Sequence, residues 1–417
     1  MKLLTFLGAG KYQPTRYRYQ GQGYLTSFSP IASCAFLRPT QVIVFVTDEV
    51  KTITLPEFLS EVPAGIEVIT RDIPIGADEQ QLWQIFDALA GCVSPGEEVA
   101  FDITNGFRSF PLLGLLAAAF LRSGFNVNLR AVLYGAFDAS RLVSPEETAM
   151  IDLTPMLTLL EWSSAADRFN RTGDARYLAS LIRQQRKTLG IAAGNDPQRK
   201  NEAGRLGNLA GALEDVSNSL RLIRPFQVMS STSGLPERVQ AAMPALQGSA
   251  ASQPFLMLLE SIQNTYTPLG MHDPLDEGQA QQSICKQREI IQWYAEREQW
   301  VQVATLAREW MVNWVMFHMR LFDICERDNR RRIEEVINSE SHHFKTACQK
   351  KEPVHLLFLR QVPQVDEALE LWNILTDTRN DINHAGMRRE PGAPEDLIKQ
   401  LQKIIERINR LPLEQNV

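Results

Sequence analysis

Cysteine is scarce and scattered in this sequence of 417 residues. Its five cysteines form no C-x-x-C pair, which argues against a zinc ribbon or a disulfide framework. Such usage fits a reducing compartment, so we expect a cytoplasmic location. The positions are Cys34, Cys92, Cys285, Cys325 and Cys348.

Long hydrophobic runs are also lacking. The longest, residues 112–121, is about half of the ~20 residues that cross a bilayer. The N-terminal stretch MKLLTFLGAGKYQPTRYRYQ holds only a short apolar run and no cleavage-site pattern, so we expect a first β-strand there rather than a signal peptide. The sequence therefore predicts no membrane association.

Positive charge is not in excess either. With 43 Lys+Arg against 49 Asp+Glu the net charge is −6, which argues against tight binding to duplex DNA. Local basic runs exist at 327–332 and at 388–389, and the plain interpretation of each is a solvated helical face.

The first part of the chain alternates between strand and helix patterns. Short apolar, β-branched runs are separated by helical windows such as 79–89 and 110–122. This alternation predicts a mostly parallel, doubly wound, Rossmann-like sheet, in which ligands bind beyond the carboxyl ends of the strands. The expected strands are 3–8, 42–47, 66–70, 99–104 and 129–134.

Small and polar residues follow three of these strands. They offer backbone N–H groups, hydroxyls, an amide and two cations, and a helix expected near Ser109 adds its positive N-terminal end. Because the strand ends meet at one edge of the sheet, we predict a site there for phosphates and nucleobases. The predicted ligand-binding residues are Gly8, Ala9, Gly10, Lys11, Thr47, Thr104, Asn105, Gly106 and Arg108.

Two familiar nucleotide-binding motifs are absent. Gln13 stands where G-x-G-x-x-G would place its third glycine, and G-x-x-x-x-G-K-[ST] does not occur. A conventional dinucleotide or ATP site is therefore not expected. Each glycine alone is equally consistent with a plain strand-to-helix turn. The string D-I-T-N-G-F-R at 102–108 carries more functional groups than a turn requires.

From about residue 153 onward, helical periodicity replaces the strand patterns. Two stretches rich in Ser, Gly, Ala and Pro, 229–253 and 265–278, are interpreted as loops or as a linker between helical regions. The helical windows are 177–189, 209–222, 284–297, 300–321 and 365–378.

Near the C-terminus, the sequence T-R-N-D-I-N-H-A-G places four residues between Arg379 and His384. A cation and a titratable imidazole suit cleavage of a phosphodiester by its own 2′-hydroxyl group. His384 would move a proton, Arg379 would hold the developing charge, and Asn380 would orient the phosphate or the imidazole. The pair alone is a weak signal, because a capping or surface histidine near Gly386 has the same pattern.

Helical geometry limits how this pair can act. If 365–383 form one helix, Arg379 lies on its apolar stripe, whereas His384 lies roughly 140° further round. One helix cannot direct both side chains to one point. Either the helix ends near Asn383, or a second chain completes the site.

Other conspicuous side chains have plain interpretations. Trp310, Trp314 and Phe317 are expected in the core. The histidines at 342–343 would point about 100° apart on a helix, which does not favour a metal site. Glu309 is consistent with either a structural or a catalytic role.

These motifs resemble a known family. F-L-G-x-G-x-Y at the N-terminus, a strand ending in Thr47, I-P-I-G at 73–76, D-I-T-N-G-F-R-S at 102–109 and Y-G-A at 134–136 resemble the CRISPR-associated Rossmann-fold (CARF) domain. R-N-D-I-N-H, with L-A-R-E-W at 306–310 in an earlier helix, resembles a HEPN ribonuclease domain. The order resembles the type III CRISPR ancillary ribonucleases of the CARF–HEPN class, over essentially the whole chain.

The resemblance implies an α/β CARF domain, then an all-α inter-domain region and a HEPN domain. It further implies a homodimer or higher oligomer, without cofactor or metal, that binds a cyclic oligoadenylate between its CARF domains and then cuts single-stranded RNA. Cyclic tetra-adenylate is the activator we predict. The implied domain boundaries are 1–155, 156–283 and 284–417.

Asn105 departs from the family pattern, since many relatives carry His there. Its amide can hydrogen-bond to phosphate or adenine but cannot act as an acid or a base. This difference puts in doubt any cleavage of the activator by the CARF domain. Two other hypotheses stay open: a non-catalytic nucleotide sensor that regulates a partner, and an enzyme that degrades the cyclic activator.

Overall fold

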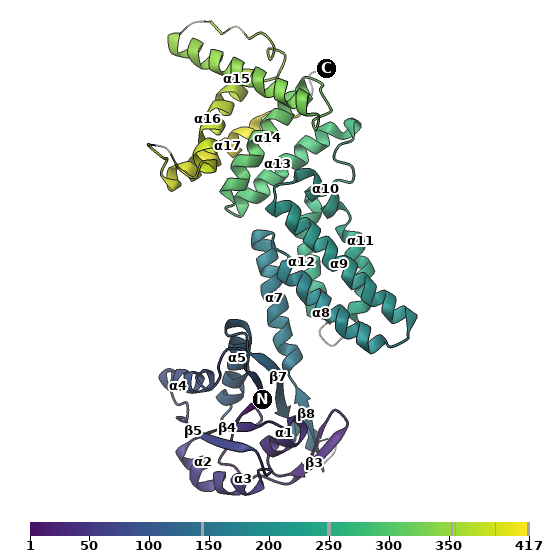
Figure 1. Ribbon diagram of the computed structural model, residues 1–417, viewed down its shortest axis with the longest axis vertical. Coiled ribbons are helices and arrows are strands. Elements are labelled where there is room, and N and C mark those ends of the chain that lie inside the picture. Colours follow the sequence, from purple (N-terminus) through teal and green to yellow (C-terminus); the bar gives the residue numbers. More distant parts are fainter. Residues whose placement is uncertain (143–145, 248–251, 352, 355, 388, 415–417) are drawn as a thin grey trace. The chain divides into compact units, whose positions relative to one another are not determined.

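The computed structural model describes residues 1–142, 146–247, 252–351, 353–354, 356–387 and 389–414 (Figure 1). These residues fall into two compact units, Met1–Leu160 and Glu161–Val417, and each is described by itself. The first unit is built on a sheet and the second contains only helices. The predicted fold class, a Rossmann-like α/β domain followed by helical regions, is confirmed.

The first unit is a sheet with the strand order β3-β2-β8-β7-β6-β1-β4-β5. Its strands are β1 (Lys2–Phe6), β2 (Thr15–Tyr19), β3 (Gln22–Thr26), β4 (Gln41–Val46), β5 (Glu67–Asp72), β6 (Glu98–Asp102), β7 (Asn128–Gly135) and β8 (Glu147–Asp152). Its helices are α1 (Ser29–Leu37), α2 (Asp48–Ile53), α3 (Leu55–Glu61), α4 (Glu79–Ala90), α5 (Ser109–Gly124) and α6 (Phe137–Arg141). The helix α7 (Thr154–Thr172) begins in this unit and continues into the second.

The five central strands, β7 to β5, are parallel, as predicted from the buried runs. The other edge is mixed, because β8 runs antiparallel to β7 and the hairpin β2–β3 adds to β8. After β1 and the hairpin β2–β3, the chain adds β4 and β5 on one side of β1 and then crosses to β6 on the other side. The strand order therefore reverses between β1 and β6, which is where such sheets bind ligands.

Helices cover both faces of the sheet, and alternate residues of each central strand enter different cores. Leu4 of β1 packs in a cluster that includes α4 and α5, whereas Leu3 packs in a cluster that includes α1, α2 and α3. Burial on both faces explains why these strands are continuous apolar runs.

The second unit is helical throughout its described residues. Its helices after α7 are α8 (Arg176–Ala193), α9 (Pro197–Arg221), α10 (Pro225–Ser233), α11 (Leu235–Gln247), α12 (Ser252–Tyr266), the short η1 (Thr267–Leu269) and η2 (Glu277–Gln279), α13 (Ala280–Glu296), α14 (Trp300–His318), α15 (Arg327–Lys350), α16 (Val365–Asn383) and α17 (Pro394–Arg410). None of the described helices is long and apolar enough to cross a membrane.

The stretch 229–253 was predicted to be a loop or linker, and this prediction is wrong for its described residues. It contains the end of α10, the whole of α11 and the start of α12. Val239 and Ala242 are buried in the core of the unit, so the small residues of this stretch serve close helix packing. Residues 248–251 lie outside the described residues.

The aromatic residues of α14 lie in the core, as predicted. Trp310, Trp314 and Phe317 are buried within a cluster that extends from α7 to the end of α17. His342 and His343 are exposed on α15, which fits the predicted solvated helix.

Glu340 is a buried carboxylate that anchors the segment before α16. It accepts hydrogen bonds from the backbone N–H groups of Leu357 at 2.8 Å, Phe358 at 2.6 Å and Leu359 at 3.1 Å. Because each donor would otherwise lose its partner, we expect Glu340→Ala to lower the free energy of unfolding by about 2–3 kcal/mol. Urea unfolding measures this loss. Glu340→Gln, which keeps one acceptor oxygen, should lose less, and equal losses for the two variants would contradict the anchoring role.

Candidate functional site

The loops after β1 and β6 meet at the reversal of the strand order. A Cβ added to Gly8 would lie 3.5 Å from the backbone nitrogen of Gly106. Gly106 has φ +103°, and a Cβ there would lie 2.6 Å from the Phe110 ring. Only glycine fits this conformation and this contact, so the two loops approach each other as bare backbone.

Two cavities of about 320 and 270 Å³ open at this meeting point, and they share Gly8, Gly10 and Gly106. Eight of the nine predicted ligand-binding residues line one or both. Those of the larger cavity are Gly8, Gly10, Lys11, Thr104, Asn105 and Gly106, and those of the smaller are Gly8, Ala9, Gly10, Thr47 and Gly106. Arg108 lines neither; it is exposed at the N-cap of α5.

Asp102, at the end of β6, is fully buried beneath the larger cavity's residues. Its carboxylate accepts hydrogen bonds from Ser33 Oγ at 2.6 Å, Ser29 Oγ at 3.3 Å and the backbone N–H of Thr104 at 3.0 Å. Burial raises the pKa of the Asp102 carboxyl above its ordinary value, and these donors only partly oppose that rise. No cation pairs with it among the described residues.

Asn105 is oriented by this buried carboxyl through a chain of hydrogen bonds. Ser29 Oγ donates its proton to Asp102, so towards Asn105 it can only accept. The Asn105 amide accordingly donates from Nδ2 to Ser29 Oγ at 2.8 Å. Its carbonyl oxygen and its second N–H are then left for a ligand in the cavity. Asn105 therefore presents an acceptor for an amino or hydroxyl group and a donor for a phosphate oxygen.

Three tyrosines outside the predicted ligand-binding set line the larger cavity. Tyr12 and Tyr134 belong to motifs of the resemblance, whereas Tyr17 was not singled out in the sequence. Tyr12 Oη accepts the N–H of Gly8 at 2.7 Å and so holds the loop after β1. Tyr17, on β2, is buried, and among the described residues its hydroxyl has no hydrogen-bond partner. Burial raises the pKa of Tyr12 to about 12 and raises that of Tyr17 as well, so both hydroxyls stay protonated donors.

The predicted catalytic residues lie at the end of α16. The helix ends at Asn383, so His384 is its exposed C-cap residue, and its backbone N–H donates to Asn380 O at 3.0 Å. The chain then turns through Ala385 and Gly386, which both have positive φ. This is the first of the two arrangements expected from helical geometry.

Arg379 is half-buried one turn before that end. Its Nη1 donates to Asn380 Oδ1 at 3.3 Å, while its buried Nε has no hydrogen-bond partner among the described residues. A buried guanidinium N–H without a partner is costly. The structure thus brings Arg379 and Asn380 together, but no hydrogen bond joins either side chain to the His384 ring in the described part of the chain.

Glu309 ties α14 to its neighbour α15. Its carboxylate accepts from Arg308 Nη1 at 3.1 Å and from Arg330 Nη2 at 2.6 Å. Arg330 also donates to the side chain of Asn313, and Arg308 to Glu334. These contacts give Glu309 a structural role in holding the helices together.

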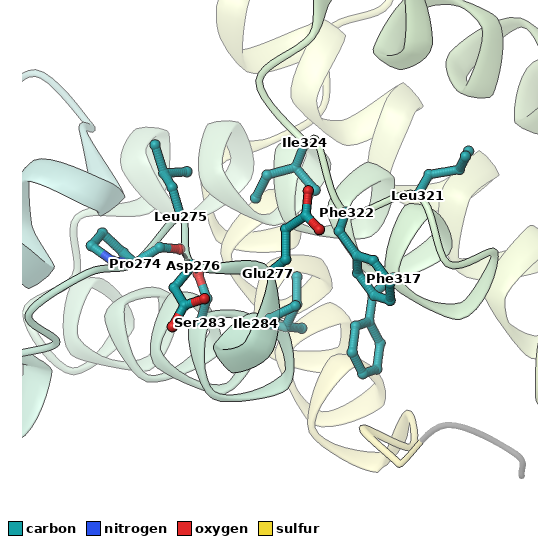
Figure 2. Close-up of a pocket in the computed structure, with 11 residues that line it drawn as sticks. Pro274, Leu275, Asp276, Glu277, Ser283, Ile284, Phe317, Leu321, Phe322 and Ile324 are labelled. Carbon is teal, nitrogen blue, oxygen red and sulfur yellow. Dashed lines mark hydrogen bonds between the residues drawn. The ribbon is translucent and has the colours of Figure 1, made fainter.

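A crevice between η2, α13 and the end of α14 is a structural feature rather than a ligand site (Figure 2). Its volume of about 10 Å³ is that of one water molecule at most. Asp276 at its rim accepts hydrogen bonds from Gly278 N and Gln279 Nε2, and Ser283 donates to Pro274 O. Asp276 and Ser283 are thus already paired, and the wall is formed by side chains such as Phe317.

No cluster of three or more His, Cys, Asp and Glu side chains that could hold a metal ion occurs among the described residues.

The helices after the sheet are similar in sequence to known proteins. Residues 158–269 match the family model described as "CRISPR-associated protein MJ1674, second domain". The curated CRISPR-associated protein MJ1674 of Methanocaldococcus jannaschii is 30% identical over 120 residues, which are 28% of this chain and 19% of that protein. The match thus spans about a fifth of the length of this relative.

A solved structure has a loosely similar course over nearly the whole chain. It is Enterococcus italicus Csm6 bound to cyclic hexa-2′-fluoro-hexa-dAMP. The likeness covers 98% of this chain and 93% of that one, with a TM-score of 0.41 and 8% sequence identity.

Proposed function

We propose that this chain, a relative of the CRISPR-associated proteins, is a type III ancillary endoribonuclease of the CARF–HEPN class. A cyclic oligoadenylate binds at the strand-end cavities of the sheet and switches on cleavage of single-stranded RNA by the helical unit. Cyclic tetra-adenylate is the activator we expect. The observation that carries the proposal is the end of α16, where an exposed imidazole follows a half-buried guanidinium by just over one helical turn.

The cavities suit an oligoadenylate in chemistry. Bare backbone at Gly8, Gly10 and Gly106 allows close approach of a bulky ligand. Asn105 offers an acceptor to an amino or hydroxyl group, Lys11 offers a cation to phosphate, and tyrosines offer ring faces and hydroxyls. The two cavities of one protomer, about 320 and 270 Å³, are large enough for part of a cyclic oligoadenylate. A second protomer would complete the binding site for the rest of the ring.

A second copy of the chain is the partner that the first unit requires. α5 exposes an apolar stripe, Leu112, Leu116 and Phe120, with Trp83 of α4 exposed beside it. An exposed apolar patch of this kind marks an interaction site. Phe110, which lines the smaller cavity, lies at the start of the same helix, so pairing along α5 would bring the cavities of two protomers together.

The chemistry is transesterification within the RNA. The 2′-oxygen forms a bond to the adjacent phosphorus, the bond from phosphorus to the 5′-oxygen breaks, and a 2′,3′-cyclic phosphate results. His384 accepts the 2′-proton or protonates the leaving oxygen, Arg379 stabilises the charge on the phosphorane, and Asn380 holds Arg379. The nucleophile belongs to the substrate, so the reaction has no need of a metal-bound water.

The test is cleavage of a labelled single-stranded RNA with and without cyclic tetra- and hexa-adenylate. We expect cleavage only with cyclic tetra-adenylate, equally in EDTA, and products that end in 2′,3′-cyclic phosphate. A matched RNA with one deoxyribose at the cut site should resist, because it lacks the nucleophile. Cleavage of that substrate at the full rate would contradict attack by the RNA 2′-hydroxyl group.

The same assay separates the two alternative functions. Activator binding without RNA cleavage, for RNAs of varied sequence, would identify a non-catalytic sensor. Chromatography of the cyclic ligand after incubation detects an activator-degrading enzyme. With the Asn105 amide engaged to Ser29, we expect the ligand to be recovered intact.

A further inference from the structure

Much of the helical hairpin α8–α9 is basic, although the chain as a whole is acidic. Residues 176–205 contain seven Lys and Arg and two acids, Asp196 and Glu202, whereas the whole chain has a net charge of −6. The cations are Arg176, Arg183, Arg186, Lys187, Arg199, Lys200 and Arg205. This part of the second unit therefore carries a local excess of positive charge.

These helices form a groove with cationic walls and a floor of small residues. Its volume is about 790 Å³ and its charged lining residues are Arg183, Arg186, Lys187 and Lys200, with no acid among them. The floor is formed by Gly190, Ala203 and Gly204 together with the exposed Ile191. A Cβ added to Gly190 or Gly204 would meet nothing within 4 Å, so both glycines border open space.

Most of the wall cations are not neutralised by the protein. Arg183 pairs with Glu214, but no acid within ion-pair distance faces Arg186, Lys187 or Lys200 among the described residues. Arg186 rests on the bare backbone of Gly207: a Cβ there would lie 2.8 Å from its Nη1. Three cations that share a groove without a counter-charge favour an anionic ligand.

We propose that the α8–α9 groove binds the sugar–phosphate backbone of single-stranded RNA and holds the substrate of the proposed nuclease. From Arg183 to Ile191 the wall is about 12 Å long at 1.5 Å per residue. Arg186, Lys187 and Lys200 offer three cations without a counter-charge to the phosphates of such a strand. The proposal rests on the proposed function for the choice of RNA, and the groove lies in the segment matched to the MJ1674 second domain.

The test measures RNA affinity by fluorescence anisotropy in the full-length His384→Ala background, without activator, so that the probe is not cut. The double variant Arg186→Glu/Lys187→Glu should weaken binding at least tenfold. It should also reduce the slope of log K against log salt by about 1.4, which is ~0.7 for each lost phosphate contact. The matched control Lys399→Glu/Lys403→Glu makes the same charge change on the exposed face of α17 and should leave affinity within twofold.

A second variant tests the groove rather than the charge. Gly204→Leu places a side chain in open space within α9 and favours the helix, so it should fill the groove without unfolding the protein. We expect weaker RNA binding with an unchanged salt slope. Wild-type affinity for this variant, or equal losses for the groove and control double variants, would overturn the proposal. So would equal competition by polyglutamate, which would identify a site for acidic polypeptides.

The outcomes separate this inference from the proposed nuclease. If RNA binding depends on the groove residues but the protein never cleaves RNA, the groove proposal is supported and the nuclease proposal is rejected. If the protein cleaves RNA when activator is present but the groove variants bind RNA as tightly as the wild type, the nuclease proposal is supported and the groove proposal is rejected.

Discussion

Replacing His384 with alanine is expected to lower the rate of activator-dependent RNA cleavage by about a thousandfold, since general acid–base catalysis contributes roughly 10²–10⁴-fold. The imidazole is exposed just beyond the end of α16, so its loss should not disturb the fold. Affinity for the cyclic activator, measured by calorimetry, should be unchanged because the cavities lie in the other unit. The readout is the initial rate of RNA cleavage at saturating activator.

Arg379 variants distinguish charge from shape at the same site. Arg379→Ala should lose at least a hundredfold in rate, and Arg379→Lys should recover only part of it, because a lysine lacks the planar fork that matches a phosphorane. His272→Ala removes an exposed histidine of the same unit and serves as the control. Cleavage at the wild-type rate by His384→Ala, or equal losses in His384→Ala and His272→Ala, would reject the assignment.

The central strands could be predicted because each is a continuous run of apolar residues, and such a run indicates a strand that is buried on both faces. Strands β1, β4 and β6 are continuous apolar runs covered on both faces. The hairpin β2–β3 could not be found in this way, because most of β3 is exposed. In addition, β2 pairs with β8, which lies over a hundred residues further along the chain. The two strands are joined by a turn at Gln20 and Gly21, where both φ values are positive.

Composition misled the prediction in the second unit. The stretch 229–253 looks like a linker because it is rich in Ser, Gly, Ala and Pro, but small residues also allow helices to pack closely. Ala242 and Ala245 of α11 are buried in the core. The predicted relationship to CRISPR-associated proteins, in contrast, is confirmed by the match over 158–269, a segment that contributed no motif to the resemblance.

The candidate sites were predictable as far as the sheet topology and the helix ends determine them. Strand ends gather at one edge, so Gly8, Thr47 and Asn105 could be placed together. The orientation of the Asn105 side chain could not be predicted, because it depends on a hydrogen bond from its amide to Ser29 of α1, which lies 76 residues earlier. Tyr17 was missed for a related reason: it reaches the cavity from β2, between β3 and β8, and β2 has no recognisable sequence pattern.

The buried carboxyl of Asp102 gives the second large prediction, a pH-dependent stability. Its pKa is raised in the folded state, so between the ordinary carboxyl value of about 3.9 and the raised value the folded protein binds more protons than the unfolded one. Wild-type stability contributed by this group therefore falls as pH rises through that interval. Asp102→Asn is nearly the same size and does not ionise, so its stability relative to wild type should increase over the same interval.

Urea unfolding of both proteins between pH 4 and pH 8 measures this difference. A difference that stays constant with pH, or that shrinks as pH rises, would contradict it. Asp102→Ala is the contrasting variant. It leaves the donors Ser29, Ser33 and Thr104 N without their acceptor, so we expect a loss of about 3 kcal/mol in the free energy of unfolding at pH 4. Alanine does not ionise either, so this loss should shrink as pH rises, in parallel with the gain of Asp102→Asn.

Activator affinity connects this carboxyl to the cavity. In Asp102→Asn the side-chain oxygen can still accept from Ser29, and the new amide can donate to Ser33, so Asn105 keeps its orientation and affinity should stay within about threefold. Ser29→Ala removes the acceptor of the Asn105 amide and should weaken cyclic tetra-adenylate binding about tenfold, roughly 1.4 kcal/mol. Ser60→Ala, at an exposed serine of α3, is the matched control and should bind as wild type does. Equal affinity of the Ser29 and Ser60 variants would show that Asn105 does not contact the activator, whatever the stability of Asp102→Asn.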